Sequence, residues 1–397
     1  MLKYFVSLLL IFLFVLESNF FAYAHWNPTV GGQLRHLILL FLTFVIIIYH
    51  KKIHLWSSGL GHVIKLLCII SIFNIIPGFI YWGIPLKEGL NIYVPLIFLI
   101  FYIYKIFNFS EKDVFRLFLI LAIVVVSIQI VQQIFPSKAL FGIFSDQNLD
   151  WGKGNIVEVR NGLNRYRIGT TSVTLLCMYY FWAKLMIKRS KGTLFMFMLM
   201  LVSLYLYLTR QLLVFSALTL ILSFFMIDNT RKRVLYICLI SIMCIIIYNF
   251  STLLFGEMFE STREESTSDN IRLIAANFFF SQSSNSFAQF LLGNGHPSEL
   301  RYWGEMFGVW PTDVGFIGEL FIYGICWVLL YFYQVWLVLI KYKNKTPMYL
   351  KLFVLATFLD SFMIFVYAYE FGMLVWTTVL YLLSININRD GCKYNHS

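Results

Sequence analysis

Residues 193–227, TLFMFMLMLVSLYLYLTRQLLVFSALTLILSFFMI, decide the fold. Their single charge is Arg210. As one helix the stretch would be about 52 Å long at about 1.5 Å per residue, far beyond the roughly 30 Å of a bilayer core. Basic clusters flank it at 184–191 and 231–233, and such clusters mark the cytoplasmic side of membrane proteins. Both clusters face the cytosol only if the stretch forms two short spans that turn at Arg210.

The same apolar character extends along the whole chain. Of its 397 residues, 59% are hydrophobic and only 13% are charged, about half the roughly 25% of soluble domains. The apolar runs are too long and too uniform for barrel strands, which alternate every second residue. The formal net charge of +11 lies mostly in short clusters between these runs, as in cytoplasmic loops, so it does not indicate nucleic-acid binding.

We therefore predict an all-α fold, a polytopic transmembrane helical bundle of about twelve spans. The predicted spans are 3–20, 34–50, 60–81, 88–106, 114–135, 169–187, 193–208, 211–227, 234–255, 314–340, 350–368 and 371–386. They divide the chain into 1–255 with the first nine spans, 256–312 as a long extracytoplasmic loop, and 313–397 with the last three spans and a cytoplasmic tail. Both termini are then cytoplasmic. Residues 1–24 also fit a cleaved signal peptide, but an uncleaved first span keeps the basic loops on one side.

Cysteine and histidine spacing indicates neither a disulfide framework nor a metal site. Five of the six cysteines lie inside apolar runs and Cys392 lies in the tail, so none has a partner in a predicted outer loop. The chain has no CxxC or HExxH spacing, and we expect neither a metal nor another cofactor.

Two predicted outer loops are rich in candidate functional residues. The first, at about 137–168, contains Lys153, Arg160, Arg165 and Arg167. The second, at 256–312, is long for a connection within a compact protein. Apolar residues recur in it at helical spacing, at Ile271, Ile274, Ala275, Phe278 and Phe279 and again at Phe287, Phe290 and Leu291. This spacing predicts short amphipathic helices packed on the outer membrane face or on the spans.

Isolated arginines on the outer side are candidates for phosphate binding. Arg210 stands alone at its turn, and a guanidinium group stays charged and forms paired hydrogen bonds with phosphate oxygens. The alternative is an arginine that anchors a helix end, although the positive-inside bias makes an outward anchor less expected. Arg272 lies in an amphipathic stretch that would face the membrane surface, and on spacing alone a solvated role is equally open.

Four further ionisable residues are candidate functional groups. Residues 292–297 read LGNGHP, a tight turn for which glycine and asparagine suit positive φ, with His296 either a proton-transfer group or merely solvated. Asp313, which opens the tenth predicted span, is a helix N-cap or a base for a sugar hydroxyl. Glu319 lies inside that span and Asp360 inside the next, where ionisable groups are costly and often functional.

In order and topology these motifs resemble the O-antigen polymerase and ligase superfamily of membrane glycosyltransferases, most strongly between about Thr209 and Gly324. The resemblance rests on the Thr209-Arg210 turn, on Arg272 ahead of short helices in a long outer loop, on the segment 293–296, and on Asp313 opening a glycine-rich span. The ligases of this superfamily have a histidine followed eleven residues later by glycine. Here Asp313 takes the place of the histidine and Gly324 that of the glycine, which favours a polymerase.

The resemblance implies a metal-independent transfer of glycan from an undecaprenyl-diphosphate carrier to a lipid-linked acceptor at the outer face of the cell inner membrane. Arg210 and Arg272 would hold the diphosphate, as would Arg301 and Arg167, and the base would be Asp313, His296 or Glu319. The expected function is a repeat-unit polymerase for O-antigen, capsule or exopolysaccharide, with membrane lipid, a chain-length regulator and a flippase as partners. The alternatives are a ligase that transfers glycan to lipid A core and a polysaccharide transporter or flippase.

Overall fold

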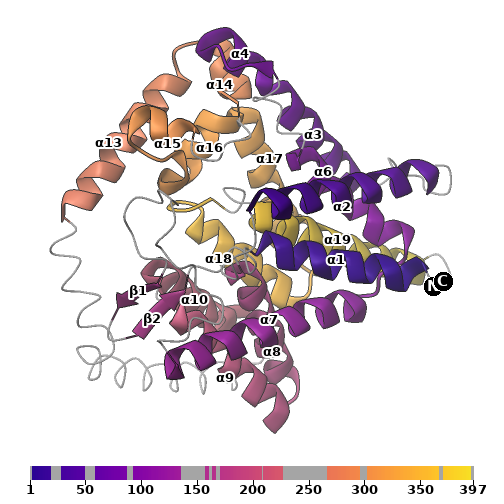
Figure 1. The fold of residues 1–397 in the computed structure, drawn as a ribbon. Coiled ribbons are helices and arrows are strands. Elements are labelled where there is room, and N and C mark those ends of the chain that lie inside the picture. Colours follow the sequence, from indigo (N-terminus) through magenta and orange to yellow (C-terminus); the bar gives the residue numbers. More distant parts are fainter. Residues whose placement is uncertain are drawn as a thin grey trace.

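The chain folds predominantly into helices (Figure 1). The computed structural model describes residues 2–18, 28–49, 59–86, 93–135, 157–160, 163–166, 170–207, 209–226, 266–295, 302–365 and 370–394. The helices of its first half are α1 (Leu2–Glu17), α2 (Pro28–Tyr49), α3 (Gly59–Phe73), α4 (Ile75–Trp82), α6 (Tyr93–Ile106), α7 (Glu111–Ile134), α8 (Thr171–Ile187), α9 (Lys191–Leu206) and α10 (Arg210–Ser223), followed by η3 (Phe224–Met226). Those of the second half are α13 (Ser266–Ser283), α14 (Phe287–Leu292), α15 (Tyr302–Phe307), η4 (Pro311–Val314), α16 (Gly315–Tyr323), α17 (Ile325–Trp336), the π-helical turn η5 (Leu337–Lys341), α18 (Met348–Asp360) and α19 (Glu370–Tyr394).

Most predicted spans coincide with helices where the structure describes them, with exceptions at 314–340 and 350–368, and the two short helices predicted in the long outer loop are present as α13 and α14. Two helical stretches within the described residues, Gly59–Trp82 and Glu111–Val131, are long and apolar enough to cross a membrane. The other apolar stretches there, such as Gln33–Tyr49 within α2 and Phe371–Ile387 within α19, are 10–17 residues long. The count of twelve spans therefore stays a prediction, and the predicted span 234–255 lies outside the described residues.

The predicted span 314–340 is wrong as a single helix. It is divided at Gly324, whose φ of 80° lies in the left-handed region, into α16 and α17. A glycine adopts such a φ without the steric cost that a side chain brings. The eleventh predicted span, 350–368, is also shorter than expected, because α18 ends at Asp360 and turns at 361–363.

An antiparallel hairpin of β1 (Val157–Arg160) and β2 (Leu163–Tyr166) lies in the first predicted outer loop. Its register pairs Arg160 with Leu163 and Glu158 with Arg165, which leaves two residues for the connection. Asn-Gly at those two positions is the strongest short-range hairpin signal in a sequence. β2 packs against α7 and α9, so the hairpin sits on the helices rather than apart from them.

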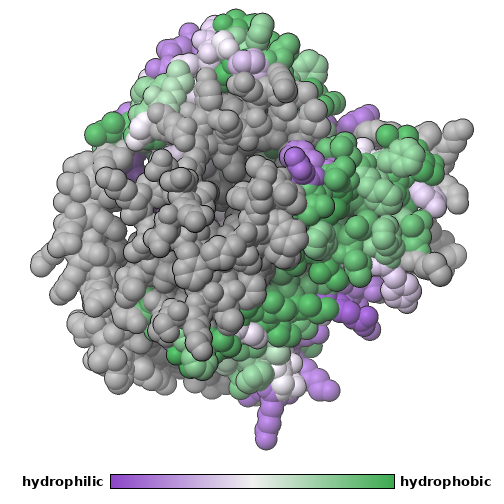
Figure 2. All heavy atoms as spheres, in the orientation of Figure 1, coloured by the Kyte–Doolittle hydropathy of each residue, from purple (hydrophilic) through white to green (hydrophobic). Residues whose placement is uncertain are grey.

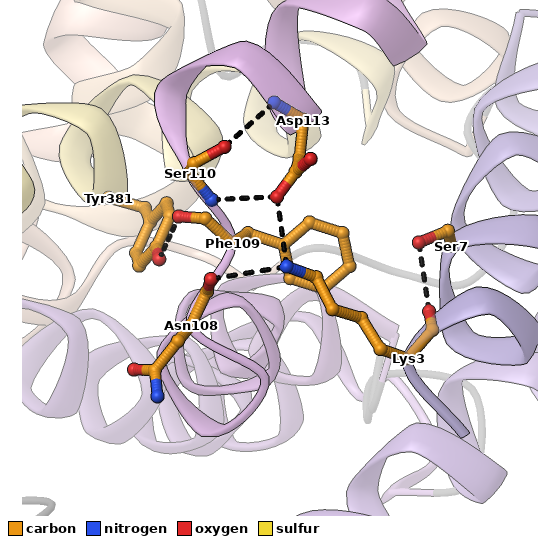
Figure 3. A network of polar contacts seen from close by, with 7 residues as sticks. All are labelled: Lys3, Ser7, Asn108, Phe109, Ser110, Asp113 and Tyr381. Carbon is orange, nitrogen blue, oxygen red and sulfur yellow. Dashed lines mark hydrogen bonds and ion pairs between the residues drawn. The ribbon is translucent and has the colours of Figure 1, made fainter. Parts of the chain in front are cut away.

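One end of the helix bundle is tied together by polar contacts around the turn between α6 and α7 (Figure 3). The Lys3 ammonium donates to the Asp113 carboxylate at 2.9 Å and to the carbonyl of Asn108 at 3.3 Å. Asp113 also closes a capping box with Ser110 at the start of α7, which satisfies amide groups that a helix end leaves without partners. These bonds fasten the beginning of α1 to the beginning of α7.

Two tyrosines bring other helices to the same turn. Tyr381 of α19 donates to the carbonyl of Phe109 at 2.7 Å, and Tyr349 of α18 donates to Glu111 at 3.1 Å. The segments 107–113, the start of α1 and the start of α18 therefore meet at one end, and these are segments for which the sequence predicts a common, cytoplasmic side.

The outward face of α2 is apolar as well as its inward face. Ile38, Leu39, Leu42, Val45 and Ile46 are buried, whereas Leu37, Leu40, Phe41, Phe44, Ile47 and Ile48 are exposed. A helix that is apolar all round is typical of a membrane span. α9 has the same character, with Leu194, Phe195, Met198 and Val202 exposed. Figure 2 shows apolar side chains gathered over the part of the surface where α1 and α2 lie, and exposed apolar areas of this kind are rare on soluble monomers.

Candidate functional site

The outer-loop helix α13 packs directly on the segment that carries Asp313. Its buried stripe is formed by Ala275, Phe279 and Ser283, and the helix packs on α16 and η4. Phe279 contacts Phe321 of α16 at a ring-centroid distance of 4.8 Å. The predicted loop is therefore part of the folded core and not a detached domain.

Arg272 belongs to the same stripe of α13 but is exposed. It precedes Ala275 by three residues and Phe279 by seven, so all three side chains leave the helix on one face. On that face Ala275 and Phe279 are buried, whereas Arg272, one turn closer to the start of α13, is exposed. The backbone position of Arg272 therefore lies on the same face of α13 as the two buried residues.

The motif Gly293-Asn294-Gly295, which we call the clasp, follows α14 and joins it to the end of α16, next to the junction with α17. The buried Asn294 side chain donates to the carbonyl of Phe321 at 3.0 Å and accepts from the indole of Trp82 at 2.6 Å and from Gln289 at 2.7 Å. Its backbone amide also donates to Phe321 at 2.8 Å. One side chain thus joins α4, α14 and α16, and the predicted tight turn with positive φ is confirmed.

Glycines let the clasp approach its neighbours at backbone distance. A Cβ on Gly293 would lie 2.2 Å from the carbonyl oxygen of Ile322, and one on Gly324 would lie 2.4 Å from that of Leu291. Gly78 of α4 faces the Asn294 carbonyl in the same way, at 2.7 Å. Any side chain at these positions would separate the segments.

Aromatic rings fill the space around the clasp. Trp82 and Trp303 lie 5.3 Å apart, and Trp303 stacks on Phe307 at 5.8 Å. The cluster comprises Trp82, Phe278, Phe279, Trp303, Phe307 and Phe321. Because it draws on α4, α13, α15 and α16, the cluster packs the predicted outer loop against the bundle through several aromatic contacts.

Asp313 is an exposed residue on a tightly held segment. A Cβ on Gly318 would lie 1.8 Å from the Pro311 carbonyl oxygen. The backbones of η4 and α16 therefore lie in direct contact here, at a distance that only glycine allows. Gly315, with φ 51°, packs on the backbone of Ser361 and Phe362 at the end of α18. These contacts explain the glycines that follow Asp313 in the sequence, and they fix the backbone that presents its carboxyl group.

The other two acidic candidates differ in access. Glu319 is 2% exposed, and the indole of Trp327 lies beside its carboxyl group, so no substrate reaches it without the helices separating. Asp360 is half-buried at the end of α18, near the hydroxyl groups of Tyr179 and Tyr331. Of these carboxyl groups, that of Asp313 is the most open to a large substrate.

Arg210 begins α10, with Thr209 as its N-cap residue. α10 packs on α18, and the end of α18 meets Gly315. The helix that begins at Arg210 therefore packs on the helix that ends at Asp360. The turn after Asp360 packs on Gly315, two residues after Asp313. The structure describes neither His296, Arg301 nor Arg167, and no group of three or more His, Cys, Asp or Glu side chains in the described ranges could hold a metal ion.

Some features of this region were not predicted from the sequence. The role of Asn294 depends on Trp82, more than two hundred positions away, and no local pattern signals it. The hydroxyl groups near Asp360 come from Tyr179 of α8 and Tyr331 of α17, and no local sequence pattern signals them either. The hairpin before α8 had a usable signal in its Asn-Gly pair.

Comparison with known proteins gives no relative: no protein-family model matches the chain, and no curated protein matches it.

Proposed function

We propose that the chain is a metal-independent membrane glycosyltransferase that joins polysaccharide repeat units. In this proposal it transfers a glycan from an undecaprenyl-diphosphate carrier to a lipid-linked acceptor at the outer face of the cell inner membrane. The product is an O-antigen, capsule or exopolysaccharide chain, and both termini of the protein face the cytosol.

One observation carries this proposal: the inner face of α13 bears an exposed arginine, and its next turns pack on the segment that presents an exposed carboxylate. α13 packs on both η4 and α16, with Phe279 in contact with Phe321 of α16. Arg272 precedes Phe279 on the same face of α13, and Asp313 lies on η4. A cationic group and a carboxylate held by one packed unit suit a reaction in which an anion departs and a hydroxyl group loses a proton.

In the proposed reaction an acceptor sugar hydroxyl attacks the anomeric carbon of the donor glycan. Asp313 removes the hydroxyl proton as the new glycosidic bond forms. The bond between the anomeric carbon and the diphosphate oxygen breaks with its electron pair, which leaves undecaprenyl diphosphate. Arg272 and Arg210 bind the diphosphate and offset the charge that develops on it, with Arg301 and Arg167 as further candidates.

A membrane setting is supported by the exposed apolar faces of α2 and α9 and by the two helical stretches long enough to cross a bilayer. The clasp supports the proposal in a second way, because it joins the predicted outer loop to Phe321 of α16 and Trp82 of α4, close to the ends of these two helices. A lipid-linked substrate would then reach Asp313 from the bilayer, with its diphosphate at the depth of these helix ends.

The test uses a strain that lacks the gene and carries plasmid copies of it, with surface polysaccharide resolved on gels. We expect Arg272→Ala and Asp313→Asn to abolish long chains and to leave single repeat units. Arg116→Ala is the matched control, because Arg116 is an exposed arginine near the start of α7 at the opposite end, and it should leave the ladder intact. Normal chain length in Arg272→Ala and Asp313→Asn, at normal protein levels, would rule out the proposal.

The strain without any copy separates the alternatives. Single repeat units on the surface support a polymerase, whereas long glycan that accumulates on the carrier lipid indicates a ligase. Repeat units that stay on the cytosolic side of the membrane indicate a flippase, for which the half-buried Asp360 would be the first residue to replace.

A further inference from the structure

The turn that carries Thr209 and Arg210 is held by a hydrogen bond between two buried hydroxyl groups. The phenol of Tyr207, at the end of α9, lies 2.5 Å from the hydroxyl oxygen of Thr170, at the start of α8. Both residues are almost fully buried. Tyr207 is also the residue whose carbonyl accepts from the Thr209 hydroxyl at 3.3 Å, and Arg210 follows directly.

A second buried bond holds the same end of α9 from another side. One turn before Tyr207, Ser203 donates to Gln129 of α7 at 2.6 Å, and both are fully buried. β2 packs on α7 and α9 at this place. The end of α9 is therefore fixed to α7 and to the start of α8, although apolar packing alone would allow it to rotate or slide.

The bundle has other buried phenol–hydroxyl pairs, Tyr104 with Thr378 and Tyr331 with Ser361, but the tyrosine of the Tyr207–Thr170 pair lies three residues before Arg210. Hydroxyl groups of this kind cost free energy to bury and recover it only when they are paired. Phenylalanine at 207 and valine at 170 would fill the same space without that cost. The residues present instead fix the end of α9 at Tyr207, three residues before Arg210.

We propose that Tyr207 and Thr170 are positioning residues that hold Arg210 in register with the diphosphate of the lipid-linked donor. This inference rests on the proposed function, because it needs Arg210 to bind the diphosphate. Paired hydrogen bonds between a guanidinium group and phosphate need a fixed direction as well as a charge. Loss of the Tyr207–Thr170 bond would leave the charge of Arg210 unchanged but would no longer fix the orientation in which its guanidinium group meets the phosphate.

The experiment measures glycan transfer by the purified full-length protein in nanodiscs, with inorganic pyrophosphate as a competing probe. Tyr207→Phe and Thr170→Val should each raise the KM for the lipid donor and the inhibitory concentration of pyrophosphate about tenfold, the effect of one hydrogen bond of about 1.4 kcal/mol. The double variant should be no worse than Tyr207→Phe alone, because Tyr207→Phe already removes the bond that Thr170→Val removes. In an Arg210→Ala background, Tyr207→Phe should have no further effect on either quantity.

Tyr381→Phe is the matched control, since it also removes a buried phenol hydroxyl that donates a hydrogen bond, here to Phe109 at the opposite end. It should lower the thermal unfolding midpoint without changing the KM or the inhibition. A Tyr207→Phe or Thr170→Val variant that behaves like this control would overturn the positioning role. If Arg210→Ala itself leaves transfer and inhibition unchanged, the failure belongs to the proposed function of Arg210.

Discussion

At the scale of single residues, glycine and asparagine determine how closely the outer segments approach the bundle. Gly293, Gly318 and Gly324 each lie so close to a carbonyl oxygen that an added Cβ would clash with it. Asn294 then supplies a donor and an acceptor where these backbones meet. The glycine-rich character of this part of the chain is thus explained by backbone contact, which is a packing requirement and does not by itself indicate catalysis.

Gly293→Ala should destabilise the protein strongly. Its φ of 82° strains an alanine, and the added Cβ would lie 2.2 Å from the Ile322 oxygen, so we expect a loss of about 2–4 kcal/mol. Gly308→Ala separates the two causes, because Gly308 has φ 70° but nothing within 4 Å of an added Cβ. It should cost only about 1 kcal/mol. Thermal unfolding of detergent-purified protein measures both, and equal losses would show that close approach is unimportant at Gly293.

Asn294→Ala should also be costly, because it removes the partner of the Trp82 indole and of the Gln289 amide at once. The Phe321 carbonyl keeps the backbone amide of residue 294 as its donor. Each group left buried without a bond costs about 1–3 kcal/mol. The control is Asn285→Ala on the neighbouring turn, where the amide bonds only to Gln282 and is exposed. Unfolding midpoints should fall markedly for Asn294→Ala and hardly for Asn285→Ala. A similar small change in both would contradict the role of the clasp.

At the scale of elements, an ion pair sits between α1 and α2. Glu17, at the end of α1, has a side chain that is 1% exposed, and Arg35 of α2 reaches its carboxylate at 3.4 Å. The carboxylate is therefore buried at a helix end that the sequence predicts to face outward. Buried charges are tolerated when they are paired, and removal of one partner costs more than the pair contributes.

Arg35→Met should therefore destabilise the protein by about 2–4 kcal/mol, since it leaves the Glu17 carboxylate buried without its counter-charge. Adding Glu17→Leu to Arg35→Met should recover most of this loss, because the double variant buries no charge. The four proteins of this cycle can be compared by thermal unfolding in one detergent. Additive losses in the double variant would mean that the two residues act independently.

The elements differ in how far the sequence predicts them. Long apolar runs predict the helices well, since an apolar stretch in a bilayer has few other structures available to it. The break at Gly324 depends on the Leu291 carbonyl from a distant segment, so local apolarity hides it. The hairpin at 157–166 lies in a short polar stretch, where the Asn-Gly pair was the informative signal. Of the candidate site, the position of Asp313 on a glycine-rich start was predictable, whereas its packing against α13 was not.

At the scale of the whole molecule, two sets of contacts lie at different helix ends. The first set joins Lys3, the turn at 107–113 and the starts of α18 and α7. The second joins α4, α14, α15 and the junction of α16 and α17 through the clasp and its aromatic cluster. The positive-inside rule assigns the first set to the cytosol and the second to the outer side, so a single experiment on sidedness tests both.

Cysteine labelling in intact cells provides that experiment. In a cysteine-free background, Ser284→Cys introduces a thiol at the exposed turn after α13, and Asn344→Cys introduces one at the exposed turn after η5. A membrane-impermeant maleimide should label the first within minutes and the second only after the cells are opened. Both thiols lie in exposed turns, so a difference between them reports sidedness and not burial. Labelling of Asn344→Cys but not Ser284→Cys in intact cells would place Arg272 and Asp313 on the cytosolic side. That result would contradict the proposed polymerase, whose substrates lie at the outer face of the membrane.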